Sequence, residues 1–82
     1  MVDERYIIIG RSSCPFCTMA IDFLKCKGIE SVFLDYESQR PILEEYKNFY
    51  NQKTVPIIIS NNNETGLIKK IGGYSNLLDH FK

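Results

Sequence analysis

The feature that most constrains the fold is a run of five residues near the start of the chain, Arg5-Tyr6-Ile7-Ile8-Ile9. Four consecutive members of this run are apolar or aromatic, so a strand built from them has two apolar faces. Strands of this kind lie inside α/β sheets, where helices cover both faces. The run therefore predicts the central strand of a sheet that has helices on either side.

The residues that follow predict a helix and a second strand parallel to the first. Apolar residues recur at helical spacing over residues 15–27, and Gly28 follows as a helix stop. Ser31-Val32-Phe33-Leu34-Asp35 has the composition of a strand. A strand, a helix and a strand in this order form a right-handed unit with parallel strands.

Pro41 predicts the start of a second helix, which we expect to end near residue 51. Four of its residues share one face at helical spacing, and we expect this apolar and aromatic face to lie in the core. These residues are Ile42, Tyr46, Phe49 and Tyr50.

The remainder of the chain predicts a hairpin and a final helix. Residues 57–59 and 67–69 are short strand-like runs, and the polar residues 61–66 between them have the composition of a hairpin loop. Ser75 is expected to cap the last helix. The predicted order is βαβαββα, in a single domain that spans residues 1–82.

Composition excludes several classes of partner. Ten basic and ten acidic residues cancel, which argues against nucleic acid because phosphate binding needs a basic surface. No apolar run approaches the roughly 20 residues of a membrane span, and the first ten residues are too acidic for a signal peptide. An odd set of three cysteines fits a reducing compartment. We therefore expect a cytoplasmic monomer that binds neither nucleic acid nor membrane.

Two of these cysteines, Cys14 and Cys17, lie in the string CPFC at the junction between the first strand and its helix. Unpaired N–H groups and the positive end of the helix dipole favour a thiolate over a thiol at Cys14. Pro15 suits an early helical position, where its missing N–H has no partner to lose. The one-turn spacing brings Cys17 close enough to attack a disulfide that Cys14 makes. The pair is therefore a candidate redox site.

Half of a zinc site is the alternative meaning of this spacing. The chain has no second pair, and Cys26 lies nine residues after Cys17 in the same predicted helix. That separation places the two side chains on opposite sides of the helix and roughly 13 Å apart along its axis. With His80 as a fourth ligand, the set does not converge on one ion. We expect no metal, and we expect Cys26 to be structural.

Four features in this order resemble the dithiol glutaredoxins over essentially the whole chain. They are Arg11 three residues before the first cysteine, the CPFC string, Thr54-Val55-Pro56 before a strand, and Gly72-Gly73-Tyr74-Ser75 before the last helix. The resemblance implies a thioredoxin fold, with a four-stranded mixed sheet of order 2-1-3-4 and three helices on its two faces. It also implies a glutathione-dependent thiol-disulfide oxidoreductase that reduces protein disulfides and glutathione mixed disulfides.

The same resemblance implies roles for individual residues. Cys14 would attack, Cys17 would resolve protein disulfides, and glutathione would be the reductant. Arg11 would hold the glycyl carboxylate of glutathione, although most relatives have Lys there. Pro56 would follow a cis peptide bond that turns the N–H and C=O of Val55 towards the tripeptide. The implied glutathione site comprises Arg11, Phe16, Thr54, Val55, Pro56, Gly73, Tyr74, Ser75 and Asn76.

Two further positions depart from the family pattern. Asn76 stands where relatives usually have an Asp that pairs with the α-ammonium of glutathione. Leu43 or Glu44 stands near the position that many relatives use for a Gln or a basic side chain. These departures leave open a thioredoxin-like redoxin that is reduced by thioredoxin reductase. A further alternative is a module in which Cys14 and glutathione hold an iron-sulfur cluster between two subunits, although Pro15 and the second thiol count against it.

Overall fold

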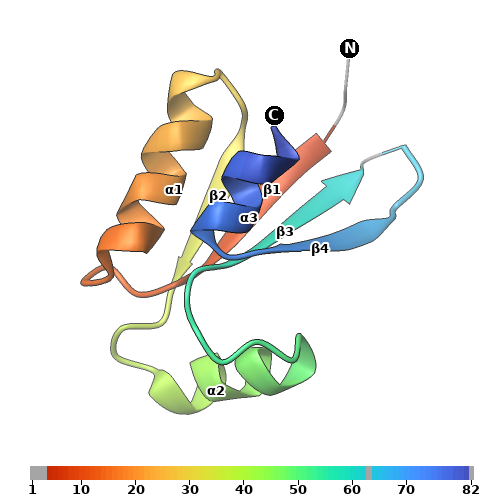
Figure 1. Cartoon of the computed structure of the whole chain (residues 1–82). Helices are drawn as coiled ribbons and strands as arrows, with labels where there is room; N and C mark the ends of the chain where they lie inside the picture. The colour runs from red at the N-terminus through yellow and green to blue at the C-terminus, as the bar shows by residue number, and fades with distance from the viewer. Residues whose placement is uncertain (1–3, 63, 82) are drawn as a thin grey trace.

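The computed structural model describes residues 4–62 and 64–81 and has the element order βαβαββα (Figure 1). A four-stranded sheet has the strand order β2-β1-β3-β4, and three helices flank it. The predicted thioredoxin fold is therefore confirmed. The elements are β1 Glu4–Gly10, α1 Pro15–Cys26, β2 Ser31–Asp35, α2 Arg40–Phe49, β3 Ile57–Asn62, β4 Ile68–Gly72 and α3 Tyr74–His80.

The run of isoleucines forms the middle of the sheet, as predicted. β1 pairs with β2 in parallel, with Ile8 opposite Phe33, and with β3 in antiparallel fashion, with Ile8 opposite Ile58. β3 pairs with β4 in antiparallel fashion, and the register shifts between Ile58 and Ile59. β1 ends just before the CPFC string, and β3 begins just after Pro56. These two points thus meet at one end of the sheet.

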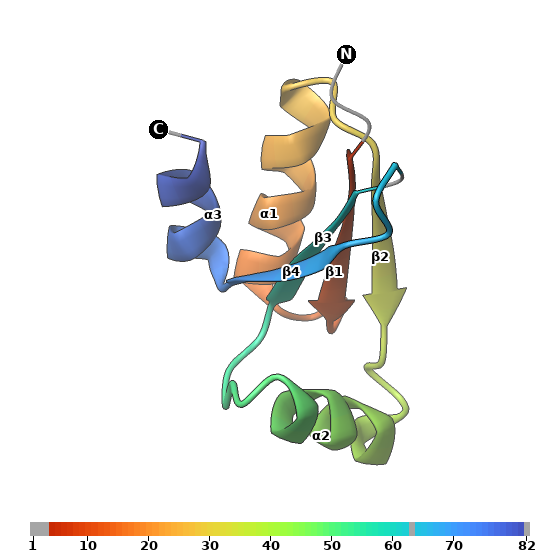
Figure 2. The same ribbon diagram turned by 90° about the vertical axis from the view of Figure 1, so that its right-hand side faces the viewer.

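Alternation along β1 divides the core into two layers. Tyr6 and Ile8 pack with buried residues of α1 and α3, and these two helices lie side by side on one face (Figure 2). Ile9 packs with Leu43 of α2 on the other side of the sheet. Both faces of the central strand are therefore covered, one by α1 and α3 and the other by side chains that include Leu43 of α2, which is why that strand is apolar on both.

The predicted core face of α2 is right for two of its four residues, since Tyr46 and Tyr50 pack against the core, and wrong for Ile42 and Phe49. Ile42 is 39% exposed and Phe49 is 79% exposed, whereas Leu43 is 2% exposed. The reason is the placement of α2, which lies across the end of the sheet where β1 and β2 finish instead of along a face (Figure 2). Only a narrow strip of such a helix reaches the core, and Leu43, Tyr46 and Tyr50 form that strip.

The hairpin strands are longer than predicted. β3 continues through Asn61 and Asn62, because backbone pairing with β1 does not require apolar side chains. The Asn62 Oδ1 atom accepts hydrogen bonds from the N–H groups of Glu64 at 2.9 Å and Thr65 at 3.2 Å, which forms the turn. β4 begins one residue later than predicted, at Ile68, and runs to Gly72.

The helix ends also refine the predictions. α1 ends at Cys26, and Gly28 follows in the left-handed region with φ +71°, as a helix stop should. The residue that caps α3 is Gly73, whose extended backbone precedes the helix, so the predicted cap at Ser75 is wrong. Ser75 lies one residue inside the helix. Within the described residues, no helix is long and apolar enough to cross a membrane.

Candidate active site

Cys14 lies at the N-cap of α1, immediately before Pro15, as predicted. Its N–H donates to the Arg11 carbonyl at 3.1 Å, and its own carbonyl accepts from the Thr18 N–H at 3.2 Å. The residue is 8% exposed, so a small part of its surface remains in contact with solvent. The sequence therefore places this sulfur at the start of a helix, where dipoles favour an anion.

Cys17 is completely buried one turn further along α1. Burial raises the pKa of the Cys17 thiol to about 12, because the charged form would lose its solvation. A backbone hydrogen bond at Arg11 opposes this effect, whereas the hydrogen bond with the Cys14 side chain adds to it. Cys17 is therefore a neutral thiol in contact with Cys14 at physiological pH.

Gly10 makes room for the Cys17 sulfur at the end of β1. A Cβ atom added to Gly10 would collide with Cys17 Sγ, and the ring of Phe33 lies 3.8 Å from the same point. Only the absence of a side chain on this residue allows the thiol to pack beneath the strand.

Two carboxylates hold the loop between β1 and α1. Asp35 Oδ1 accepts hydrogen bonds from the N–H groups of Glu37 at 3.0 Å and Ser12 at 3.1 Å, and Glu37 Oε1 accepts from the Ser13 N–H at 3.1 Å. The bond from Glu37 is the main reason that the pKa of Asp35 lies below its ordinary value. The pKa of Glu37 is lowered mainly by a hydrogen bond from the Ser13 side chain. The Ser13 backbone and the charge of Arg11 lower it further. These anchors gave no recognisable signal in the sequence.

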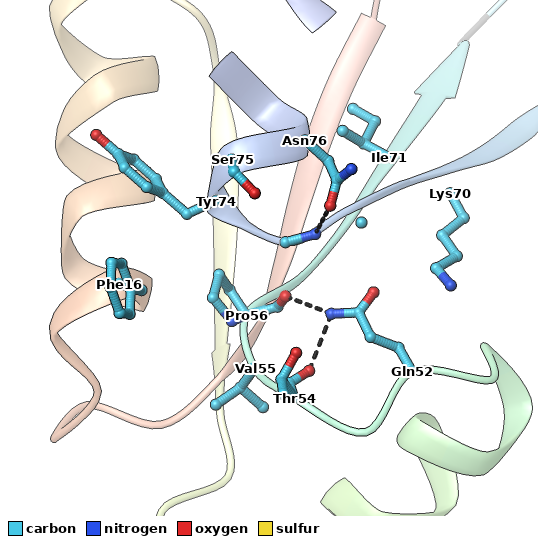
Figure 3. Close-up of a pocket in the computed structure, with 12 residues that line it drawn as sticks. Phe16, Gln52, Thr54, Val55, Pro56, Lys70, Ile71, Tyr74, Ser75 and Asn76 are labelled. Atoms are coloured by element: carbon cyan, nitrogen blue, oxygen red, sulfur yellow. Dashed lines mark hydrogen bonds between the residues drawn. The ribbon is translucent and has the colours of Figure 1, made fainter. Parts of the chain in front are cut away.

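A groove of about 730 Å³ lies between the start of α1, the loop before β3, and the junction of β4 with α3 (Figure 3). It includes eight of the nine residues that the resemblance assigned to glutathione. The ninth, Arg11, lies beside the cysteine pair and does not line the groove. The lining residues are Phe16, Gln52, Thr54, Val55, Pro56, Lys70, Ile71, Gly72, Gly73, Tyr74, Ser75 and Asn76.

Two aromatic rings form one wall of the groove. Phe16 is 55% exposed, and its ring centroid lies 6.0 Å from that of Tyr74, with an angle of 37° between the planes. Phe16 points out of α1 towards Tyr74 at the start of α3 (Figure 3). An exposed ring beside the cysteines is suited to contact with an apolar part of a ligand.

The opposite wall is the loop before β3. The Val55–Pro56 peptide bond is cis, as the resemblance implied. In the part of the chain that the structure describes, neither the N–H nor the C=O of Val55 has a hydrogen-bond partner. The groove therefore presents one unpaired main-chain donor and one unpaired main-chain acceptor, as the edge of a sheet does.

The junction of β4 and α3 closes the far end of the groove. Gly72 has φ +120°, and a Cβ there would lie 2.7 Å from Asn76 Oδ1. That oxygen accepts a hydrogen bond from the Gly73 N–H at 3.0 Å. The Asn76 side-chain oxygen is thus already used within the protein. Lys70 is the one charged residue among the groove-lining residues described above.

Sequence reasoning missed Gln52 and Lys70. At the position where many relatives have a Gln or a basic side chain, Leu43 is in the core, and Glu44 forms an ion pair with Lys47 at 3.2 Å on the surface of α2. Gln52 lies only two residues before Thr54, so its closeness to the TVP string was a signal that could have been used.

Comparisons with known proteins agree with this geometry. The family model described as glutaredoxin matches residues 6–64, which include both cysteines and Pro56. The four residues from Gly73 to Asn76 lie beyond the matched range. The comparison with curated proteins found no match.

Several solved structures share the fold. A buckwheat glutaredoxin in complex with glutathione is 15% identical, with a TM-score of 0.76 over 98% of this chain and 70% of that chain. Reduced glutaredoxin from Escherichia coli is 24% identical, with a TM-score of 0.68 over 93% and 91% of the two chains. Glutaredoxin 1 from Francisella tularensis, complexed with cacodylate, is 23% identical, with a TM-score of 0.64 over 95% and 92%.

Proposed function

The chain belongs to the glutaredoxin family of thiol-disulfide oxidoreductases, and we propose that it is a dithiol member that uses glutathione as its reductant. The observation that carries the proposal is the Cys14–Cys17 pair at a helix start, beside a groove whose wall offers the unpaired N–H and C=O of Val55. The buckwheat glutaredoxin of the same fold was crystallised with glutathione, which supports the choice of reductant.

The reaction on a protein disulfide begins at Cys14. Its thiolate attacks one sulfur of the substrate, which forms a mixed disulfide and releases the other substrate sulfur as a thiol. Cys17 then loses its proton, attacks the sulfur of Cys14, and releases the second substrate thiol. Two glutathione molecules reduce the resulting Cys14–Cys17 disulfide and leave as glutathione disulfide.

Glutathionylated proteins need only one thiol of the enzyme. Cys14 attacks the glutathione sulfur of the substrate, takes over the glutathionyl group, and releases the protein thiol. A second glutathione attacks the glutathione sulfur of that adduct, and Cys14 departs as a thiolate. Neither step involves Cys17.

The groove supports binding of an extended tripeptide. Val55 would pair with the cysteinyl residue of glutathione through both main-chain groups, as an added strand does. The aromatic wall of Phe16 and Tyr74 would cover its apolar side, and Thr54 and Pro56 would complete the opposite side. Gly73, Ser75 and Asn76 would adjoin the γ-glutamyl end, and Arg11 would attract the glycyl carboxylate.

The proposal also covers the compartment, the oligomeric state and the substrates of the protein. We propose that the protein acts as a cytoplasmic monomer, on disulfide-containing or glutathionylated proteins. No metal or nucleic acid has a part in this mechanism.

A coupled assay tests the proposal. NADPH oxidation is followed on a small glutathione mixed disulfide, with either glutathione and glutathione reductase or thioredoxin reductase as electron source. We expect turnover with the glutathione system, retention of that turnover in Cys17→Ser, and its loss in Cys14→Ser. Turnover with thioredoxin reductase alone would support the redoxin alternative, and equal activity of the two variants would contradict the assigned roles. An absorbing cluster after anaerobic purification would favour the iron-sulfur alternative.

A further inference from the structure

Gln52 lines the groove, and its side-chain amide makes two hydrogen bonds to the loop before β3. Its Nε2 atom donates hydrogen bonds to the carbonyl of Thr54 at 2.9 Å and to the carbonyl of Pro56 at 2.7 Å (Figure 3). These two carbonyls flank Val55 on either side. A single amide group therefore ties together the residues before and after the unpaired main-chain groups.

The backbone of Gln52 is itself fixed to the end of α2. Its N–H donates to the Lys47 carbonyl at 2.9 Å, and the preceding Asn51 has φ 53°, which turns the chain back at the helix end. Lys70 Nζ donates to the nearby Tyr50 carbonyl at 2.7 Å and joins β4 to the same turn. The side chain of Gln52 thus extends from a well-anchored base.

The other end of the Gln52 amide is buried without a partner. Among the described residues, Gln52 Oε1 is the buried side-chain oxygen for which no hydrogen bond exists. A buried acceptor without a hydrogen bond is destabilising, so stability alone does not explain this arrangement. If the side-chain amide were turned over, Oε1 would face the carbonyl oxygens of Thr54 and Pro56. The two donations to the loop therefore determine how the side chain lies.

We propose that Gln52 is a positioning residue, which holds the Thr54–Pro56 loop in the shape that lets Val55 pair with the glutathionyl part of a substrate. The proposal rests on the proposed function, because it specifies how the same groove recognises glutathione. A loop held in its bound shape before binding loses less conformational entropy on association. Gln52 should thus affect binding and leave the reactivity of Cys14 unchanged.

Steady-state kinetics on a glutathione mixed disulfide test this role in Gln52→Ala and Gln52→Glu. Loss of both donations should raise KM about tenfold, which corresponds to about 1.4 kcal/mol of binding free energy, and leave kcat within about twofold. In Gln52→Glu, a carboxylate faces the two carbonyls, so KM should rise further as pH increases through the titration of that carboxyl. The matched control is Asn48→Ala, which removes an exposed amide on α2 that makes no side-chain hydrogen bond in the described structure.

Separate measurements distinguish this inference from the proposed function. The rate of Cys14 alkylation by iodoacetamide, as a function of pH, should be the same in the wild type and in Gln52→Ala. An unchanged KM with only a lower unfolding temperature would overturn the positioning role, as would an altered alkylation profile. Absence of glutathione-dependent turnover in the wild type would instead contradict the proposed function itself. If the KM of Gln52→Glu did not vary with pH, that result would also contradict the positioning role of Gln52.

Discussion

The close approach of Gly10 and Cys17 makes Gly10→Ala an informative substitution. The backbone of Gly10 lies outside the left-handed region, so alanine is tolerated there and the effect comes from the added methyl group alone. That group would occupy space that belongs to Cys17 Sγ. Non-bonded heavy atoms prefer separations of about 3.5–4.0 Å, so the sulfur must withdraw by roughly 1 Å or more, which disturbs its contact with Cys14.

We expect two measurable consequences. Overpacking of this kind costs about 1–3 kcal/mol, which for a domain of this size lowers the unfolding temperature by at least about 4 °C. Reduction of a protein disulfide should fall, because the resolving thiol no longer faces Cys14. Turnover of a glutathione mixed disulfide should fall less, because it does not use Cys17.

Gly66→Ala is the matched control. Gly66 has φ +71° and no atoms near the added Cβ, so the control introduces backbone strain without a collision and lies away from the cysteines. Thermal unfolding and the two activities are measured on both variants. The reasoning is refuted if Gly10→Ala reduces protein disulfides as well as the control does.

Three further predictions follow from burial and titration. Hydrogen bonds lower the pKa of Asp35 in the folded protein, so its contribution to stability is present above the ordinary value of 3.8 and is lost as pH falls through the lower folded value. In Asp35→Asn, the unfolding temperature between pH 2 and pH 5 should therefore depend less on pH, and an unchanged dependence would contradict the assignment. Cys17, with a pKa of about 12, should be alkylated slowly up to about pH 10 in the native protein, as peptide mass mapping can show, and quickly once the protein is unfolded. Leu43→Ala should lower the free energy of unfolding by about 2–5 kcal/mol and Phe49→Ala by less than about 0.5 kcal/mol in denaturant titrations; the reverse order would contradict the core described above.

Local patterns in the sequence predicted most of the fold. The isoleucine run of β1 and the helix from Pro15 have short-range signatures, and these elements form as predicted. The apolar face of α2 was assigned correctly at Tyr46 and Tyr50 and misassigned at Ile42 and Phe49, because helical spacing identifies a face but not the direction in which the sheet lies. Phe49 is therefore exposed, and Leu43, which lies off the predicted face, is buried.

The candidate site was predictable where its residues form recognisable strings. Phe16, Val55 and Gly73 were identified from such strings, and they line one groove. Gln52 and the carboxylate of Asp35 were missed, because their hydrogen bonds to the loops depend on how connections pack in space. A single sequence contains no local pattern for a side chain that supports a loop on another segment.

The burial of Cys17 has a consequence for the order of events. A sulfur with no accessible surface cannot meet a substrate directly, whatever its intrinsic nucleophilicity. It can react only with a disulfide that Cys14 has already formed with the substrate. In the proposed reaction, packing alone therefore prevents a start at Cys17, and no difference in chemical rate is needed to enforce the sequence of steps.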